Sequence, residues 1–130
     1  MTQTILIVDD DKMIRRILRL LLTRNQYEVV EAENGQEALE IIEENCPNLV
    51  VIDILMPVMD GFDTVRQIRS KLICEKLPVL FLTARADVET ENKGLELGAQ
   101  RFLTKPINLD EFVKTIKDLI AESQTQAEIQ

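Results

Sequence analysis

Carboxylates stand at the ends of two apolar runs that are typical of buried β-strands. The run Thr4–Val8 leads into three consecutive aspartates, Asp9–Asp11, and the run Leu49–Ile52 ends on Asp53. A carboxylate is costly to remove from water unless an opposite charge or a cation lies beside it. Because ligands gather beyond the carboxyl ends of parallel strands, we expect a site there, with Asp53 as the first candidate for a reacting group.

Aspartates brought together in this way suit a hard divalent cation. Asp9, Asp10 and Asp53 would repel one another and titrate abnormally unless a positive ion lay among them. Ligation by oxygen atoms alone, completed by backbone carbonyls and water, is preferred by Mg²⁺ and disfavoured by zinc and copper. The alternative is that Asp9–Asp11 only cap the following helix, whose positive end attracts acidic side chains. The presence of acid at both strand ends favours the Mg²⁺ site.

Two further polar side chains follow apolar runs of the same kind. Thr83 comes after Pro78–Leu82, and Lys105 comes after Arg101–Thr104, so a hydroxyl and a fixed positive charge would face the carboxylates. This arrangement lacks only an anion. A phosphoryl group bonded to Asp53 would fit, because the cation and Lys105 would neutralise its oxygens and Thr83 would donate a hydrogen bond. The predicted nucleophile is therefore Asp53.

The stretches between these strands have the periodicity of amphipathic helices. Residues 88–98 follow a suitable N-cap, Asp87, but carry no clean apolar stripe, so we expect this helix to pack weakly. Apolar residues recur at helical spacing in residues 12–25, 38–42, 62–72 and 109–121, and residues 27–30 form a further short strand.

Five strands that alternate with five helices predict an α/β fold with a flavodoxin-like, doubly wound, five-stranded parallel sheet in the order 2-1-3-4-5. In that order the first and third strands are neighbours, and their carboxyl ends share one crevice. The fold therefore places Asp9 and Asp10 beside Asp53.

The composition describes a single acidic domain. The chain has 130 residues, 45% of them hydrophobic, and a formal net charge of −8. This balance argues against a surface that binds nucleic acid, which needs an excess of lysine and arginine. No apolar run is long enough to cross a membrane, and the N-terminus lacks the pattern of a secretory signal, so we expect a cytoplasmic location.

Histidine and cysteine offer little further chemistry. The chain contains no histidine and two cysteines, Cys46 and Cys74. The missing histidine removes the usual general base and the usual transition-metal ligand. The cysteines are far apart in the sequence and lack Cys-x-x-Cys spacing, so we expect neither a zinc site nor a redox pair.

Taken in order, these residues resemble the receiver domain of two-component response regulators, including its single-domain chemotaxis members. The resemblance covers nearly all of residues 4–120 and implies a receiver domain at residues 1–121, with a polar tail or the start of a linker at residues 122–130. The residues that carry it are Val8-Asp9-Asp10, Asp53 with Met56-Pro57 and Asp60-Gly61, Thr83-Ala84, Gly98-Ala99, Phe102 and Lys105-Pro106.

The resemblance implies a signalling switch, which catalyses only its own phosphorylation and dephosphorylation and is not a classic enzyme. Asp53 would accept a phosphoryl group from a phosphohistidine on a sensor histidine kinase or a histidine phosphotransfer protein, and a downstream protein effector would bind the result. The implied Mg²⁺ ligands are Asp10, Asp53 and the carbonyl of Leu55, with Asp9 acting through water. The residues implied to bind the phosphoryl group are Met56, Thr83, Ala84 and Lys105.

The resemblance also implies how the signal would leave the site. Thr83 would move toward the phosphoryl group and Phe102 would turn inward, which would alter the surface of the fourth helix, fifth strand and fifth helix. The Lys105–Pro106 bond would be cis, a form that proline tolerates. Some positions depart from common family choices: Phe102 lacks the tyrosine hydroxyl, and Leu55 and Arg85 lie where the family tunes attack by water. Because an apolar Leu55 cannot orient that water, we expect slow dephosphorylation.

The first helix has a basic side formed by Lys12, Arg15, Arg16, Arg19 and Arg24. This side is either a solvated surface that balances nearby carboxylates or a docking surface for the phosphohistidine protein. The fifth helix, around Thr115, lacks the arginine-rich pattern expected of the transcription-factor type, so we expect a monomer.

Three other protein classes fit the sequence less well. A phosphatase resembling the haloacid dehalogenase superfamily would use an Asp-x-Asp pattern, as Asp9–Asp11 provides, but would need a further acidic pair where Thr83–Arg85 stands. A flavodoxin would need a phosphate loop rich in hydroxyl groups and glycine at Asp9–Asp11. A receiver used only for interaction, without phosphorylation, would not need the complete set of acidic residues, threonine and lysine.

Overall fold

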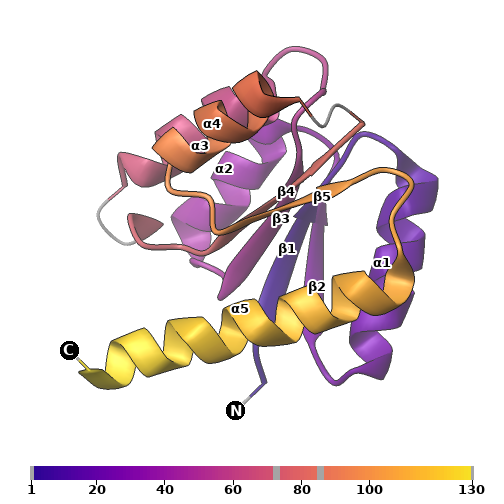
Figure 1. The fold of residues 1–130 in the computed structure, drawn as a ribbon, viewed down its shortest axis with the longest axis vertical. Coiled ribbons are helices and arrows are strands. Elements are labelled where there is room, and N and C mark those ends of the chain that lie inside the picture. The colour runs from indigo at the N-terminus through magenta and orange to yellow at the C-terminus, as the bar shows by residue number, and fades with distance from the viewer. Residues whose placement is uncertain (1, 72–73, 85–86, 130) are drawn as a thin grey trace.

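The computed structural model describes residues 2–71, 74–84 and 87–129, with side chains as far as residue 125. Within these ranges five strands and five helices alternate along the chain (Figure 1). The strands are β1 (Thr4–Val8), β2 (Glu28–Ala32), β3 (Leu49–Asp53), β4 (Val79–Thr83) and β5 (Arg101–Thr104), and the helices are α1 (Lys12–Arg24), α2 (Gly35–Glu44), α3 (Gly61–Arg69), α4 (Val88–Glu96) and α5 (Leu109–Ile129).

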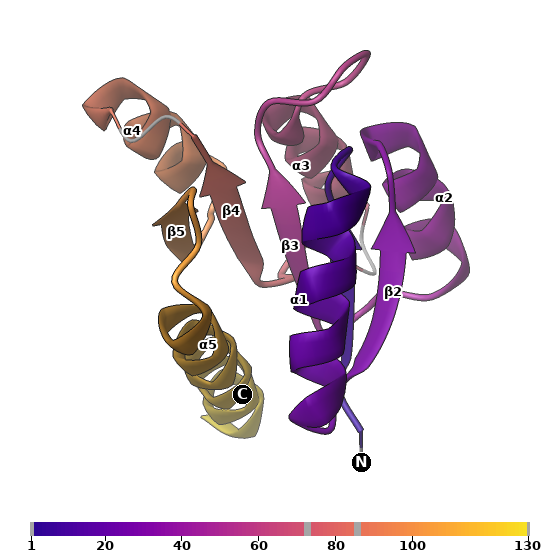
Figure 2. The same ribbon diagram turned by 90° about the vertical axis from the view of Figure 1, so that its right-hand side faces the viewer.

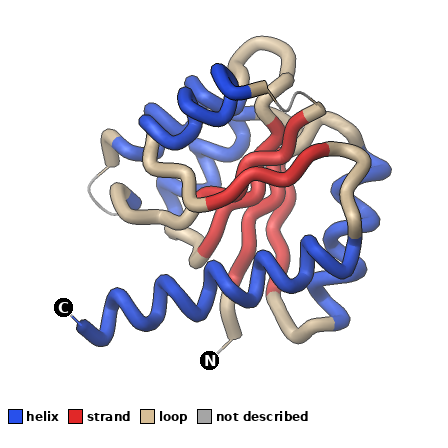
Figure 3. Tube along the Cα trace, in the orientation of Figure 1, coloured by secondary structure: helices blue, strands red, loops and turns tan. Residues whose placement is uncertain are grey.

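The strands form one parallel sheet in the order β2-β1-β3-β4-β5, which confirms the predicted flavodoxin-like, doubly wound α/β fold. Figure 3 shows the strands side by side at the centre of the molecule, with the helices around them. In the sheet Val8 lies beside Ile52, and Asp53 lies beside Leu82. The residues that follow β1 and end β3 therefore reach the same edge of the sheet.

Helices cover both faces of this sheet. α1 and α5 lie on one face, and α2, α3 and α4 lie on the other (Figure 2). Strand residues alternate between the two faces, so Ile5 and Ile7 pack with α1 and α5, while Leu6 and Val8 pack with α2 and α3. β1, β3 and β4 are buried along nearly their whole length, as runs without polar alternation predict.

Each of the first four helices begins at a side chain that caps its N-terminus. Asp11, Asn34, Asp60 and Asp87 accept hydrogen bonds from main-chain N–H groups in the first turns of α1 to α4. These caps satisfy N–H groups that have no partner within the helix. The predicted cap at Asp87 is confirmed, and Asp11 is the member of the three consecutive aspartates that caps α1.

Several boundaries differ from those predicted. β2 spans Glu28–Ala32, not residues 27–30, and its burial alternates because it is an edge strand. α3 ends at Arg69, and Leu72, which was predicted within this helix, lies outside the described residues. Residues 122–129, predicted as a polar tail or the start of a linker, continue α5 as a helix. The domain boundary at residue 121 stays a prediction.

α4 is only weakly tied to the core, as predicted. Gly94 is its one buried residue. Among the described residues, the helices include none that combines the length and the apolar character needed to cross a bilayer.

Candidate functional site

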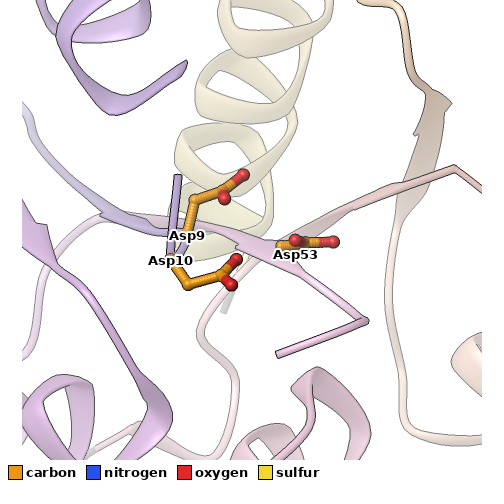
Figure 4. A group of neighbouring side chains, drawn as sticks. All are labelled: Asp9, Asp10 and Asp53. Atoms are coloured by element: carbon orange, nitrogen blue, oxygen red, sulfur yellow. The ribbon is translucent and has the colours of Figure 1, made fainter. Parts of the chain in front are cut away.

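Three aspartates gather at the carboxyl edge of the sheet. Asp9 and Asp10 follow β1 and Asp53 ends β3, so the pairing of these two strands brings them together (Figure 4). One carboxylate oxygen of each lies within 4.8 Å of the others. Asp9 is fully buried and Asp53 is 5% exposed, whereas Asp10 is exposed to solvent. The cluster is therefore open to water on the side of Asp10.

Lys105 joins two of these carboxylates. Its Nζ lies 3.0 Å from Oδ2 of Asp9 and 3.2 Å from Oδ2 of Asp53. The main-chain N–H of Lys105 donates to the carbonyl of Thr83 at 2.8 Å, which anchors the start of the loop after β5 to the end of β4. The peptide bond from Lys105 to Pro106 is cis, as the resemblance implies.

Burial and charge together govern protonation at the site. Burial and the charge of Asp9 raise the pKa of the Asp53 carboxyl, and Lys105 and the N–H of Leu55 offset only part of this effect. Burial alone would lower the pKa of Lys105, but its bond to Asp9 and the charge of Asp53 outweigh burial and raise that pKa. One ammonium leaves these carboxylates with excess negative charge. The oxygen-only set of Asp9, Asp10 and Asp53 fits Mg²⁺, which would neutralise that charge.

The loops after β3 and β4 surround Asp53. The N–H of Leu55 donates to Oδ1 of Asp53 at 3.3 Å, and the Leu55 side chain is half exposed. Met56 is buried against the core, and Ala84 lies at the surface directly after β4. Arg85, predicted to influence attack by water, lies outside the described residues.

Gly61 holds the loop after β3 close to Asp53. Its N–H donates to the carbonyl of Ile54 at 2.8 Å. A Cβ atom at this position would collide with the main-chain carbonyl oxygen of Asp53. Glycine is therefore required for α3 to begin directly beside the end of β3.

Thr83 and Phe102 lie on the side of the site that faces α4. Thr83 is buried at the end of β4 and lines a shallow pocket together with Glu89 and Lys93 of α4. The ring of Phe102 is partly buried and packs against Phe81, with ring centroids 5.3 Å apart. The two predicted switch residues thus both adjoin the helix that is least tied to the core.

α4 rests on a row of three phenylalanine rings. Phe62, Phe81 and Phe102 follow one another with centroids 5.3 Å apart at each step. Nζ of Lys93 lies 5.0 Å from the Phe62 ring centroid at one end of the row, and a Cβ at Gly94 would overlap the Phe102 ring at the other end. This role of Gly94 was not predicted from the sequence. The available signal was a glycine inside a helix, where it is unfavourable without a packing reason.

The basic side of α1 is partly used within the chain. Arg15 is buried and donates to the carbonyl of Asp9 at 2.5 Å and to Glu31 at 3.1 Å. Arg19 donates to the other oxygen of Glu31 at 2.7 Å. For Arg15 and Arg19 this supports the alternative in which α1 balances nearby carboxylates, and a buried Arg15 cannot act as a docking charge.

Cys46 and Cys74, which nothing in the sequence indicated as a pair, are joined by a disulfide. Their Cα atoms are 6.0 Å apart, although 28 residues separate them in the sequence. Cys46 follows α2 and Cys74 follows α3, and these helices lie beside each other on the same face of the sheet (Figure 2). The packing of the two helices brings the cysteines together, which sequence spacing does not encode.

Comparison with known proteins identifies the family and supports the fold. Residues 5–117 match the family model of the response regulator receiver domain, and the chain belongs to this family of two-component signalling domains. Response regulator MprA of Mycobacterium sp. strain KMS is 43% identical over 116 residues, which cover 89% of this chain and 50% of that protein. The chain thus spans about half the length of the curated relatives that it matches.

Solved receiver structures share the fold. The chemotaxis protein CheY4 of Vibrio cholerae is 32% identical with a TM-score of 0.88, covering 92% of this chain and 99% of that one. The receiver domain of Francisella response regulator 1452 is 31% identical with a TM-score of 0.86, covering 94% and 99%. Receiver domains are signalling domains and not classic enzymes, so family membership removes the phosphatase and flavodoxin alternatives.

Proposed function

We propose that this chain is a cytoplasmic, phosphorylation-dependent switch in which Asp53 accepts a phosphoryl group from a phosphohistidine. The observation that carries this proposal is the pairing of Lys105 with both Asp9 and Asp53, beside the exposed carboxylate of Asp10. A carboxylate nucleophile then lies next to a fixed cation that can neutralise phosphoryl oxygens. Because these 130 residues contain no histidine, the phosphohistidine has to lie outside this sequence, and we assign it to a sensor histidine kinase or a histidine phosphotransfer protein.

In the transfer step a carboxylate oxygen of Asp53 bonds to phosphorus while the phosphorus–nitrogen bond to the partner's imidazole breaks. The leaving nitrogen keeps the electron pair of that bond. We propose that the phosphoryl oxygens are bound by Lys105, Thr83, Met56 and Ala84. Bound Mg²⁺ would supply further neutralisation of phosphoryl charge. Its proposed ligands are Asp10, Asp53 and the carbonyl of Leu55, with Asp9 acting through water.

We assign the relay of the signal to Thr83 and Phe102. Thr83 shares a pocket with Lys93 of α4, and Phe102 contacts Gly94 of the same helix. A shift of Thr83 toward the phosphoryl group would change the packing beside the phenylalanine row. α4 would respond most readily, because Gly94 is its one buried residue. A downstream protein effector would bind the altered surface of α4, β5 and α5.

An apolar groove beside the site supports docking of the phosphohistidine protein. The groove has a volume of about 210 Å³, and Lys105 forms part of its wall. Because the phosphorus atom has to reach Asp53, the donor protein must cover this rim of the molecule. We propose that an apolar surface around its histidine packs into the groove. The apolar lining comes from α1 and from the segment after β5, and consists of Ile14, Ile17, Leu18, Pro106, Ile107 and Leu109.

The test is intact-mass measurement after incubation with acetyl phosphate, a small acyl phosphate, in Mg²⁺ or in EDTA. Wild type should gain one phosphoryl group in Mg²⁺, and Asp53→Asn should gain none. Asp60→Asn is the matched control, because it also removes one nearby carboxylate while asparagine can still cap α3. Absence of a mass gain that depends on Asp53 would overturn the proposal.

A further inference from the structure

We propose that Cys46 and Cys74 form a reversible thiol–disulfide site whose oxidation state alters the hold on α4. The disulfide joins the segment after α2 to the turn before β4, at the opposite edge of the sheet from Asp53. In the cytoplasm a disulfide is usually transient and redox-sensing. The site does not depend on phosphorylation of Asp53. The cytoplasmic location of the chain and the reading of α4 as an output surface both rest on the proposed function.

The two sulfur atoms differ in their access to a reductant. Cys74 is 1% exposed, so a thiol from solvent cannot approach it directly. Cys46 is partly exposed and lines an open cavity of about 390 Å³. Thr4, Val30 and Asn48 form other parts of the cavity wall. Attack by an external thiolate is therefore directed to Sγ of Cys46.

The reaction is thiol–disulfide exchange with glutathione or a protein dithiol. The thiolate sulfur bonds to Sγ of Cys46, the bond between the two cysteines breaks, and Cys74 leaves as a thiolate that takes a proton. A second thiolate then displaces Cys46 from the mixed disulfide. The two cysteines gain two electrons and two protons, and the two reductant thiols become one disulfide. Glutathione disulfide drives the reverse reaction.

Arg69 binds the turn that contains Cys74. The N–H of Leu77 donates to the carbonyl of Cys74 at 3.1 Å and closes this turn. Nη1 of Arg69 donates to the carbonyls of Glu75 and Leu77, at 3.1 and 2.6 Å. The position of this guanidinium is therefore set in part by the turn that the disulfide anchors.

The same guanidinium binds the C-terminal end of α4. Nε of Arg69 donates to the carbonyl of Leu97 at 3.0 Å, and Nη2 donates to the carbonyl of Gly98 at 3.1 Å. Arg69 is partly buried, so its N–H groups need these carbonyl partners. One side chain thus connects the end of α4 to the turn at Cys74.

Reduction of the disulfide changes the turn at Cys74, which is where the connection through Arg69 to α4 begins. Two sulfur atoms that are no longer bonded must stand further apart than bonded ones, so the turn at Cys74 is released from the segment after α2. The carbonyls of that turn move with it, and Arg69 holds the end of α4 less firmly. We expect faster hydrogen exchange in the reduced form at Gly98 and Ala99, whose N–H groups donate to carbonyls of α4.

The pairing is tested on the full chain in glutathione buffers of increasing ratio of reduced to oxidised form. The samples are quenched with iodoacetamide, and their intact masses are measured. We expect species with either no alkylated cysteine or two, converting in a single transition. Cys74→Ser should be glutathionylated at Cys46 roughly tenfold faster than Cys46→Ser is at Cys74. Two free thiols at every buffer ratio would overturn the proposal.

The connection to α4 is tested by hydrogen exchange on the oxidised and reduced forms. Reduction should speed exchange at residues 97–99 severalfold. The double variant Cys46→Ser, Cys74→Ser should not respond to the buffer. Arg69→Lys keeps the charge but not the four-carbonyl contact, so it should lose the difference between forms, whereas Arg66→Lys, at an exposed position of α3, should keep it. Equal exchange in the oxidised and reduced wild type would overturn the connection, whatever the variants do.

Discussion

Nζ of Lys105 lies 3.2 Å from Oδ2 of Asp53, although the two residues are 52 positions apart in the sequence. The same nitrogen lies 3.0 Å from Oδ2 of Asp9, so one ammonium contacts two buried carboxylates. Burial and the charge of Asp9 nevertheless raise the pKa of Asp53. The ionised carboxyl of Asp53 therefore costs stability in the folded protein, which predicts how substitutions and cations act at this site.

Asp53→Asn should raise the free energy of unfolding by about 1 kcal/mol at neutral pH in EDTA. The pKa of Asp53 is higher in the folded chain than its ordinary value of 3.8, so the wild type loses stability as the pH rises from that value through the folded pKa. Asparagine does not titrate. The stability advantage of the variant should vanish in acid, where the Asp53 carboxyl of the wild type is protonated in both the folded and the unfolded chain. Urea unfolding at neutral pH and at about pH 3 measures this. An Asp53→Asn variant that is less stable than wild type at neutral pH would contradict the prediction.

Mg²⁺ should stabilise the wild type by about 2.7 kcal/mol at a concentration of about 100 times its Kd. Asp10→Asn removes the exposed carboxylate that we propose as a Mg²⁺ ligand, and it should abolish most of this effect. Asp11→Asn removes the same charge one residue away but keeps a good N-cap for α1, so it should retain the effect. Thermal unfolding in EDTA and in a Mg²⁺ series measures this. Equal losses in the two variants would show general charge screening in place of a defined site.

Gly94→Ala should destabilise the protein by about 1 to 3 kcal/mol, because its Cβ would overlap the ring of Phe102. Alanine is the better helix former by about 1 kcal/mol, and we expect the overlap to outweigh that gain. Adding Phe102→Leu removes the ring and should restore part of the loss, so the two effects should be non-additive. Urea unfolding of both single variants and the double variant measures the coupling. A Gly94→Ala protein more stable than wild type would show that helix propensity dominates.

Arg15→Met should destabilise the protein by about 2 kcal/mol at neutral pH, because Glu31 and the carbonyl of Asp9 lose a buried donor. Burial raises the pKa of Glu31, but hydrogen bonds from Arg19 and Arg15 outweigh burial and lower it below its ordinary value of 4.5. A carboxyl whose pKa is lowered by folding stabilises the protein at a pH above its ordinary pKa, and this contribution is lost as the pH falls through the folded pKa. The cost of Arg15→Met should therefore shrink in acid. Arg16→Met, at an exposed position, should stay within about 0.5 kcal/mol of wild type.

Leu55→Asn should shorten the lifetime of the proposed phosphoryl group. Leu55 is 51% exposed, and its own main-chain N–H donates to Oδ1 of Asp53. An asparagine amide could hydrogen-bond to the attacking water. One such bond is worth about 1 kcal/mol, which corresponds to a roughly fivefold faster loss. The measurement is the decay of labelled protein after removal of the acyl phosphate, and equal decay rates would exclude a role for this position.

The sequence by itself determined the fold and the edge of the sheet at which the charged residues meet. Apolar runs without polar alternation specify strands buried on both faces, and the helices between them require parallel crossovers. Once these features set the order of the strands, the positions of the residues at the strand ends relative to one another are largely determined. Asp9, Asp53 and Lys105 therefore come together as the topology predicts.

The tertiary structure alone decided which side chains touch between separately formed helices and loops. The disulfide of Cys46 and Cys74, the contact of Gly94 with Phe102, and the carbonyl contacts of Arg69 are all of this kind. Each depends on how far a helix is rotated and where it is seated on the sheet. Those quantities are set by packing over the whole core, so no local spacing in the sequence records them.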